Sequence, residues 1–180
     1  MEAIVFDKEH GMLSELKNGK IFVDCTTSRP SLAKTIANEL ERQNAFALDA
    51  PVSGGDVGAK NGTLSFMIGG QEDVVKQVLP CFKAMGSKYE CMGPAGQGQH
   101  TKMVNQIFIA SGMMGLVEGL VYARNASLDS SKVIELLSGG AAGSWSLSNY
   151  GPRILKVCSC HTLCSSPNMF LERFRTRVLY

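Results

Sequence analysis

The sequence predicts an α/β layer architecture that is followed by an all-helical part. From residue 1 to about residue 92, short β-rich segments alternate with helix-like segments. After the glycine-rich stretch 93–98, the pattern is helical up to about residue 156. Because ligand sites favour the junctions between such units, we expect functional residues near this stretch.

Each expected element has a local signal. Four runs rich in apolar and β-branched residues are expected to be strands: 20–25, 45–49, 64–68 and 88–92. The helix expected over residues 31–43 is entered through Pro30 and places Leu32, Ile36 and Leu40 on one face. Further helices are expected over 71–82, over about 99–123, and from the N-cap Asp129 to Leu137.

The composition is that of a globular protein with a sizeable core. The 180 residues are 44% hydrophobic and 19% charged, with a net charge of +2. This small charge argues against nucleic acid or an acidic membrane surface as a partner, and the cluster Arg173, Arg175 and Arg177 is expected to be solvated. The first residues show no secretory or organellar targeting pattern, which favours a cytoplasmic protein.

Two further features have ordinary structural interpretations. The apolar stretch 103–123 contains Asn105, Gln106 and Glu118, so we expect a buried helix in a packed protein and not a membrane span. Three cysteines in apolar or strand-like contexts are expected to be buried free thiols: Cys25, Cys81 and Cys91.

The first segment with candidate chemistry is 49–55 (DAPVSGG). A strand leads into a turn in which Ser53 offers a hydroxyl, and Gly54 and Gly55 let backbone N–H groups approach a ligand closely. Such a turn is suited to holding a carboxylate. Taken alone, however, a Ser-Gly-Gly turn is more often an ordinary loop.

The second segment is 96–105 (GQGQHTKMVN), in which glycines open a helix. Lys102 and Asn105 lie three residues apart and therefore share a helical face. The helix dipole and partial burial would lower the pKa of Lys102, so that it can exchange a proton with a substrate oxygen oriented by Asn105. Taken alone, Lys102 is more safely interpreted as an exposed surface lysine.

The third segment is 23–30 (VDCTTSRP), where a buried strand ends in hydroxyl residues and a helix begins. In open parallel sheets this carboxyl edge faces the ligand crevice, which makes Thr27 a candidate cofactor contact. The alternative is a helix-entry turn that uses Ser and Thr as caps.

In this order and at these spacings, the segments resemble the β-hydroxyacid dehydrogenase family, in particular the plant-type 3-hydroxyisobutyrate-dehydrogenase-like proteins. DAPVSGGDVGAKNGTL is similar to the family's substrate-binding loop, GQGQHTKMVNQ to its catalytic helix, and GGAAGSWSLSNYGPRIL to the helical segment that follows. The resemblance covers about residues 1–156. It implies a remnant of a Rossmann-like parallel-sheet domain over 1–93, the start of an all-helical C-terminal domain over 94–156, and a divergent tail over 157–180.

The resemblance implies an oxidoreductase that uses NAD or NADP and moves a hydride between the nicotinamide and a small 3-hydroxy acid or a related aldehyde or keto acid. It implies these roles: general acid/base for Lys102, substrate carboxylate binding for Ser53, Gly54 and Gly55, substrate orientation for Asn105, and nicotinamide contact for Thr27. We expect no metal ligand. Gln106 stands where a second carboxamide usually follows the Asn, which is a mild departure.

Two stronger departures concern the ends of the chain. No GxGxxG motif precedes residues 20–25, so we expect a chain truncated at both ends, with an open sheet edge and an uncovered apolar face. The tail suggests a shifted reading frame or a retained intron. Its candidate zinc ligands are too closely spaced for us to expect a metal site: Cys158, Cys160, His161 and Cys164.

These departures leave alternatives to a working oxidoreductase. One is an inactive truncated subunit that associates with a full-length homologue through the helix 103–123, in place of a homo-oligomer. The two are separated by whether the purified chain is monodisperse alone, as expected for a working enzyme, or only when mixed with a full-length homologue. Another is a gene-model fragment, for which no polypeptide carrying residues 158–180 would be detected.

Overall fold

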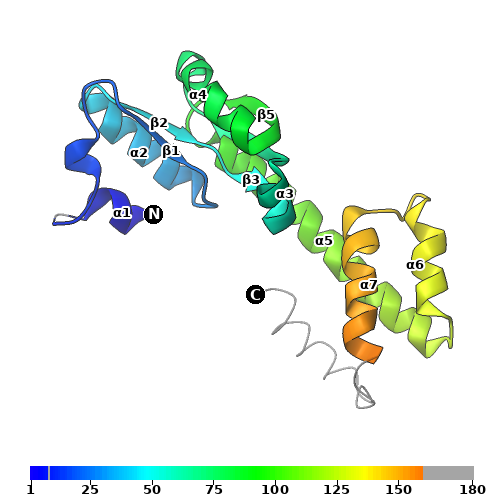
Figure 1. The fold of residues 1–180 in the computed structure, drawn as a ribbon. Helices are drawn as coiled ribbons and strands as arrows, with labels where there is room; N and C mark the ends of the chain where they lie inside the picture. Colours follow the sequence, from blue (N-terminus) through cyan, green and yellow to red (C-terminus); the bar gives the residue numbers. More distant parts are fainter. Residues whose placement is uncertain (8, 160–180) are drawn as a thin grey trace. The chain divides into compact units, whose positions relative to one another are not determined.

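The computed structural model describes residues 1–7 and 9–159. The chain divides into two compact units, Met1–Gln106 and Ile107–Tyr180, and the division falls inside the long helix α5 (Gln97–Asn125). Figure 1 shows the elements of both units along the chain. The domain boundary expected at residues 93–94 stays a prediction.

The first unit is built on a five-stranded sheet, which confirms the expected α/β fold class. Its strands are β1 (Ile21–Asp24), β2 (Phe46–Asp49), β3 (Val52–Ser53), β4 (Leu64–Gly69) and β5 (Gly86–Gly93). The pairs β1–β2 and β4–β5 are parallel, whereas β2 and β3 both pair antiparallel with β4. The sheet is therefore mixed. After β2 the chain passes through Pro51 and runs along β4, where the Met67 N–H donates to the Pro51 carbonyl at 3.0 Å.

Successive side chains of a strand point to opposite faces of the sheet, so both faces carry apolar side chains. Helices cover both of these faces. On one face, α2 (Pro30–Arg42) packs with α1 (Glu2–Phe6) and the 3-10 helix η1 (Leu13–Glu15). The core there contains Val5, Leu16, Leu32, Ile36 and Leu40. The expected uncovered face is thus partly covered by the first sixteen residues, whereas β1 is an edge strand of the described sheet.

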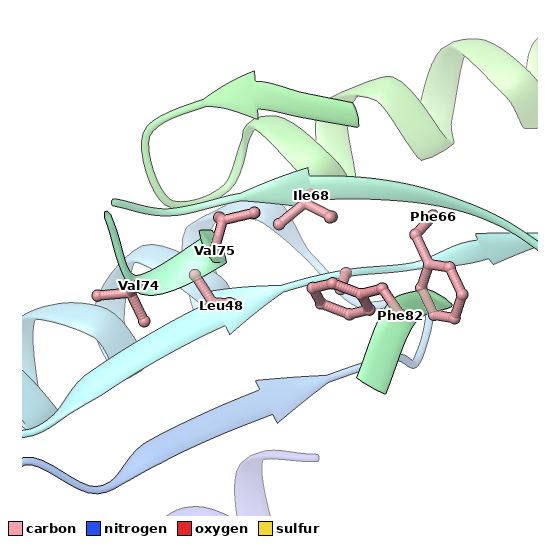
Figure 2. Packing of buried hydrophobic residues seen from close by; sticks show 7 residues of the cluster. Leu48, Phe66, Ile68, Val74, Val75 and Phe82 are labelled. Carbon is pink, nitrogen blue, oxygen red and sulfur yellow. The ribbon is translucent and has the colours of Figure 1, made fainter. Parts of the chain in front are cut away.

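The other face packs against α4 (Glu72–Met85). Phe66 and Phe82 lie close together in the apolar cluster on this face (Figure 2). Their ring centroids are 4.9 Å apart and the ring planes are tilted by 46°. Leu48 and Ile68 complete the centre of this cluster. Each such side chain stabilises the fold by about 1.5–3 kcal/mol through removal from water, which anchors the strands whose ends carry the candidate site.

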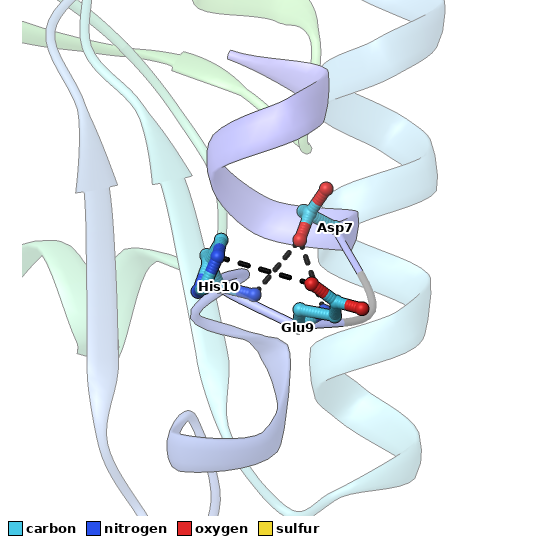
Figure 3. A network of polar contacts seen from close by, with 3 residues as sticks. All are labelled: Asp7, Glu9 and His10. Carbon is cyan, nitrogen blue, oxygen red and sulfur yellow. Dashed lines mark hydrogen bonds and ion pairs between the residues drawn. The ribbon is translucent and has the colours of Figure 1, made fainter.

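A short polar turn follows α1 on the surface (Figure 3). Asp7 accepts hydrogen bonds from the backbone N–H groups of His10 at 2.8 Å and Glu9 at 3.0 Å, and these bonds lower the pKa of its carboxyl. The imidazole of His10 lies 3.9 Å from the Glu9 carboxylate. All three side chains are exposed, so the turn shapes the connection from α1 to η1 and adds little stability.

The described part of the second unit is helical, and it comprises the rest of α5, α6 (Ser130–Ser138) and α7 (Trp145–Ser159). The expected N-cap is confirmed, because the Asp129 carboxylate accepts from the N–H groups of Ser131 and Lys132. The core of the three helices is made by Leu116, Leu120, Ile134 and Ile154.

Two burial predictions were wrong. Within the described residues, α5 is the helix long and apolar enough to span a membrane by length and composition, yet only 17% of its apolar window is buried. Its apolar side chains surround the helix, while only one side packs against α6 and α7. Cys25 and Cys81 are exposed and Cys91 is half-buried, because Cys25 follows the last residue of β1 and Cys81 lies on the solvent side of α4.

Candidate active site

The predicted carboxylate-binding turn lies at the end of β3. Ser53 is the last residue of this strand, and the helix α3 (Gly55–Asn61), which was not expected from the sequence, begins directly after it. Gly54 and Gly55 have φ angles of 131° and 61°, a region that L side chains rarely adopt. A Cβ on Gly55 would meet nothing within 4 Å, so the backbone at this position is open to a ligand.

The start of α5 is held by a buried carboxylate at the end of β2. Asp49 accepts hydrogen bonds from the backbone N–H groups of Gly96 at 2.7 Å and Gln99 at 2.9 Å. Burial raises the pKa of Asp49, and these two hydrogen bonds oppose that rise. Gly98 packs so closely that a Cβ added at this position would lie 2.5 Å from the Asp49 carbonyl oxygen. The first turn of α5 is therefore fixed directly against β2.

Lys102, the proposed acid/base, lies beside the turn. Its Nζ donates to the Val52 carbonyl oxygen at 2.7 Å, and the residue is only 8% exposed. Burial lowers the pKa of this amine. Lys102 is therefore buried and hydrogen-bonded, and the alternative interpretation as an exposed surface lysine does not apply. Its hydrogen-bond partner, Val52, is the residue directly before Ser53 in the sequence.

The other two predicted residues lie around this centre with fewer constraints. Asn105 is half-buried one helical turn beyond Lys102, and its Nδ2 donates to the Oε1 of Gln106 at 3.1 Å. Thr27 is exposed in the loop after β1. This loop is linked to α5 through Gln99, whose side chain hydrogen-bonds the residues on both sides of Thr27.

Sequence reasoning missed three buried residues of this site: Asp24, Asp49 and Gln99. Asp24 and Asp49 are paired in register at the ends of β1 and β2. A carboxylate as the last residue of an otherwise apolar strand is the signal that could have found both. Gln99 leaves no such signal, because its partners are backbone atoms. The tail cysteines and His161 lie outside the described side chains, and the described residues include no cluster that could hold a metal ion.

Known families match nearly all of the described chain. Residues 2–93 match the NAD-binding domain of 6-phosphogluconate dehydrogenase, and residues 96–159 match the NAD-binding region of NADP-dependent 3-hydroxyisobutyrate dehydrogenase. An NAD-binding α/β domain joined to this helical region defines a class of nicotinamide-dependent oxidoreductases. Within that class, the chain belongs to the 3-hydroxyisobutyrate dehydrogenase-like family.

The similarity is strong in sequence and in structure. The chain is 54% identical over 153 residues to a probable 3-hydroxyisobutyrate dehydrogenase-like 1 protein of Arabidopsis thaliana, covering 85% of this chain and 46% of that protein. It is 49% identical over 152 residues to an uncharacterized oxidoreductase of Bacillus subtilis, covering 84% and 53%. The structure of Mycobacterium tuberculosis 3-hydroxyisobutyrate dehydrogenase with L-serine superposes with a TM-score of 0.71 at 29% identity, covering 78% and 48%. The chain thus spans about half the length of these relatives.

Proposed function

We propose that the protein is an NAD(P)-dependent oxidoreductase acting on a small 3-hydroxy acid or on the related aldehyde or keto acid. The observation that carries this proposal is the placement of Lys102. Its amine contacts the Val52 carbonyl directly before Ser53, Gly54 and Gly55, so a proton-transfer group adjoins a backbone that is open to a carboxylate. Membership in a family of dehydrogenases supports the same reaction class.

The chemistry assigned to this chain is proton transfer and substrate placement. In the oxidation direction, the substrate O–H proton passes to the neutral Nζ of Lys102 as the C–H electron pair leaves and a carbonyl forms. Backbone N–H groups at Gly54 and Gly55, together with the Ser53 hydroxyl, would bind the carboxylate, and Asn105 would orient the reacting oxygen. A bound nicotinamide supplies the hydride acceptor.

The described residues fit the nicotinamide end of such a cofactor. Thr27 is exposed at the carboxyl end of β1, where doubly wound sheets bind dinucleotides, and its loop is anchored to the helix that carries Lys102. The sequence contains no GxGxxG turn for the pyrophosphate. The proposal includes both NAD and NADP, because the descriptions of the matched family models name both nucleotides.

The first test is a fluorescence titration of NADH and NADPH into the purified chain, followed by assays with small 3-hydroxy acids. Saturable binding and turnover are expected. Lys102→Ala should lower kcat by about 10²- to 10⁴-fold, as expected for loss of a general acid/base. Lys83→Ala, the same substitution at an exposed lysine on α4, is the matched control and should keep most of the activity. A folded chain that binds neither nucleotide would refute the proposal.

The pH dependence of oxidation is a second test. The base must be the neutral amine, and burial lowers the pKa of Lys102. The rate should therefore rise with pH and level off below the ordinary lysine pKa of about 10.4. Lys102→Arg should lose this limb, because a guanidinium does not give up its proton in this range. A wild-type profile that is flat with pH would contradict the assignment.

A second candidate function is a subunit that associates with a longer homologue without chemistry of its own. The observations that favour it are the edge strand β1 and the exposed apolar side chains of α5, such as Val104, Ile107 and Phe108. Homo-oligomerisation through the same helix is the corresponding proposal for the enzyme. Analytical ultracentrifugation of the chain, alone and mixed with a full-length homologue, separates these assemblies. Cytoplasmic location stays a prediction.

A further inference from the structure

The Gln99 side chain is a buried polar link between two elements of the site. It is 0% exposed in the first turn of α5. Its Nε2 donates to the Thr26 carbonyl at 2.8 Å, and its Oε1 accepts from the Ser28 backbone N–H at 2.9 Å. One carboxamide therefore holds the backbone on both sides of Thr27, and both of its polar atoms have partners.

Two buried carboxylates fix the ends of this link. Asp49 accepts from the backbone N–H of Gln99 at 2.9 Å, which holds the helix end. Asp24 accepts from the Thr26 backbone N–H at 2.8 Å, which holds the loop end. The loop 26–28 and the first turn of α5 are thus tied to neighbouring strands and to one another.

We propose that Gln99 is a positioning residue that sets the placement of Thr27, and of the nicotinamide beside it, relative to the amine of Lys102. This inference rests on the proposed function. Gln99 and Lys102 lie three residues apart on one rigid helix, a rise of about 4.5 Å, so the carboxamide and the amine share one frame. Hydride and proton leave neighbouring substrate atoms, and their acceptors must therefore be held in fixed relation.

Gln99 could act through stability alone, as a buried polar group that has found its partners. Two variants separate the roles. Gln99→Met keeps the length and removes both hydrogen bonds. Gln99→Glu keeps an acceptor for the Ser28 N–H but, when ionised, has no donor for the Thr26 carbonyl. The control Ile68→Val, 1% exposed in the core of the same unit, costs stability without touching the loop.

Amide hydrogen exchange tests the link without any reaction. In Gln99→Met the Ser28 amide should exchange about five- to tenfold faster, as expected for loss of one hydrogen bond. In Ile68→Val, the exchange rate of the Ser28 amide relative to the rates of the β4 amides should match that of the wild type. Unchanged Ser28 exchange in a folded Gln99→Met protein would overturn the inference.

Kinetics test the positioning. Gln99→Met should lower kcat by up to about 10²-fold, with a small change in the KM of the hydroxy acid and a larger primary deuterium isotope effect. Gln99→Glu should recover toward wild type as the pH falls, because a protonated carboxyl again offers a donor and an acceptor. Wild-type kcat and isotope effect in Gln99→Met would overturn positioning. If Lys102→Ala keeps full activity, the proposed function falls with it, while Ser28 exchange still decides the link.

Discussion

The beginning of α5 and the remainder of the same helix are built in opposite ways. Between Gly96 and Lys102, the residues Gly96, Gly98, Gln99 and Lys102 are buried, and hydrogen bonds tie this segment to the ends of β2 and β3. From Met103 to Ile109, large apolar side chains are exposed, with Val104 at 51% and Phe108 at 74%, whereas Leu116 and Leu120 further along are buried against α6 and α7. One helix thus combines a polar, buried start with an apolar segment that is exposed.

The difference shows which part of the helix is held in place by hydrogen bonds to the sheet. Buried polar groups have defined partners and directions, so the start of α5 holds Lys102 and Gln99 in one arrangement. Exposed apolar side chains have no directional partners, and a large exposed apolar patch typically marks an interaction surface. Catalytic placement and assembly are therefore expected to respond to different substitutions along the same helix.

The largest expected effect on the placement of Lys102 comes from Gly98→Ala. The added Cβ would collide with the carbonyl oxygens of Met67 and Asp49, which are backbone atoms that cannot rotate away. Overpacking of this kind destabilises by about 1–3 kcal/mol, and it would move Lys102 away from Val52. Urea unfolding and the reactivity of the Lys102 amine measure the two consequences.

The control for this substitution lies on the exposed part of the same helix. A Cβ on Gly115 would meet nothing within 4 Å, so Gly115→Ala should stabilise the protein by about 0.5–1 kcal/mol through helix propensity. Equal effects of the two substitutions would abolish the contrast between the two parts of α5.

A smaller effect, visible as a pH dependence, is expected for Asp49→Asn. Burial raises the pKa of Asp49, so the folded state favours the protonated carboxyl. The stability that this group contributes is fully present below its unfolded pKa of about 3.9 and is lost as the pH rises through the folded value. The free energy of unfolding of the wild type relative to the variant should fall as the pH rises from about 4.

Urea unfolding of both proteins at several pH values measures this difference. Lys60→Met, an exposed position on α3, serves as a charge-changing control and should give a constant difference across the same range. A difference between wild type and Asp49→Asn that grows with pH would mean that the hydrogen bonds from Gly96 and Gln99 outweigh burial.

Local patterns predicted the elements that are long enough to show them. The apolar run 20–25 became β1, the spacing of Leu32, Ile36 and Leu40 became the buried face of α2, and Asp129 capped α6 as expected. The two-residue strand β3 is too short for a periodic signal, and α3 has too few apolar side chains for one. Antiparallel pairing with β4 is a long-range property that no local pattern contains.

The site shows the same limit. The family resemblance grouped Lys102 with Ser53, Gly54 and Gly55, and the structure brings the Lys102 amine to Val52 across fifty positions of sequence. Their roles stay predictions until the variants are measured. The hydrogen bonds of Gln99 to Thr26 and Ser28 could not be predicted, because a carboxamide can pair with any backbone group that the fold brings near it.

The smallest effect on stability is expected for Phe108→Ser. The side chain is 74% exposed, so the free energy of unfolding should change by no more than about 0.5 kcal/mol. Leu116→Ala, two turns further along and 7% exposed, should cost about 2–5 kcal/mol, because it opens a cavity against α6 and α7. If the apolar surface of α5 mediates assembly, sedimentation should show a weaker oligomer for Phe108→Ser at unchanged stability. A large loss of stability in this variant would instead place Phe108 in the fold of the monomer, and the exposed body of α5 would then be no separate surface.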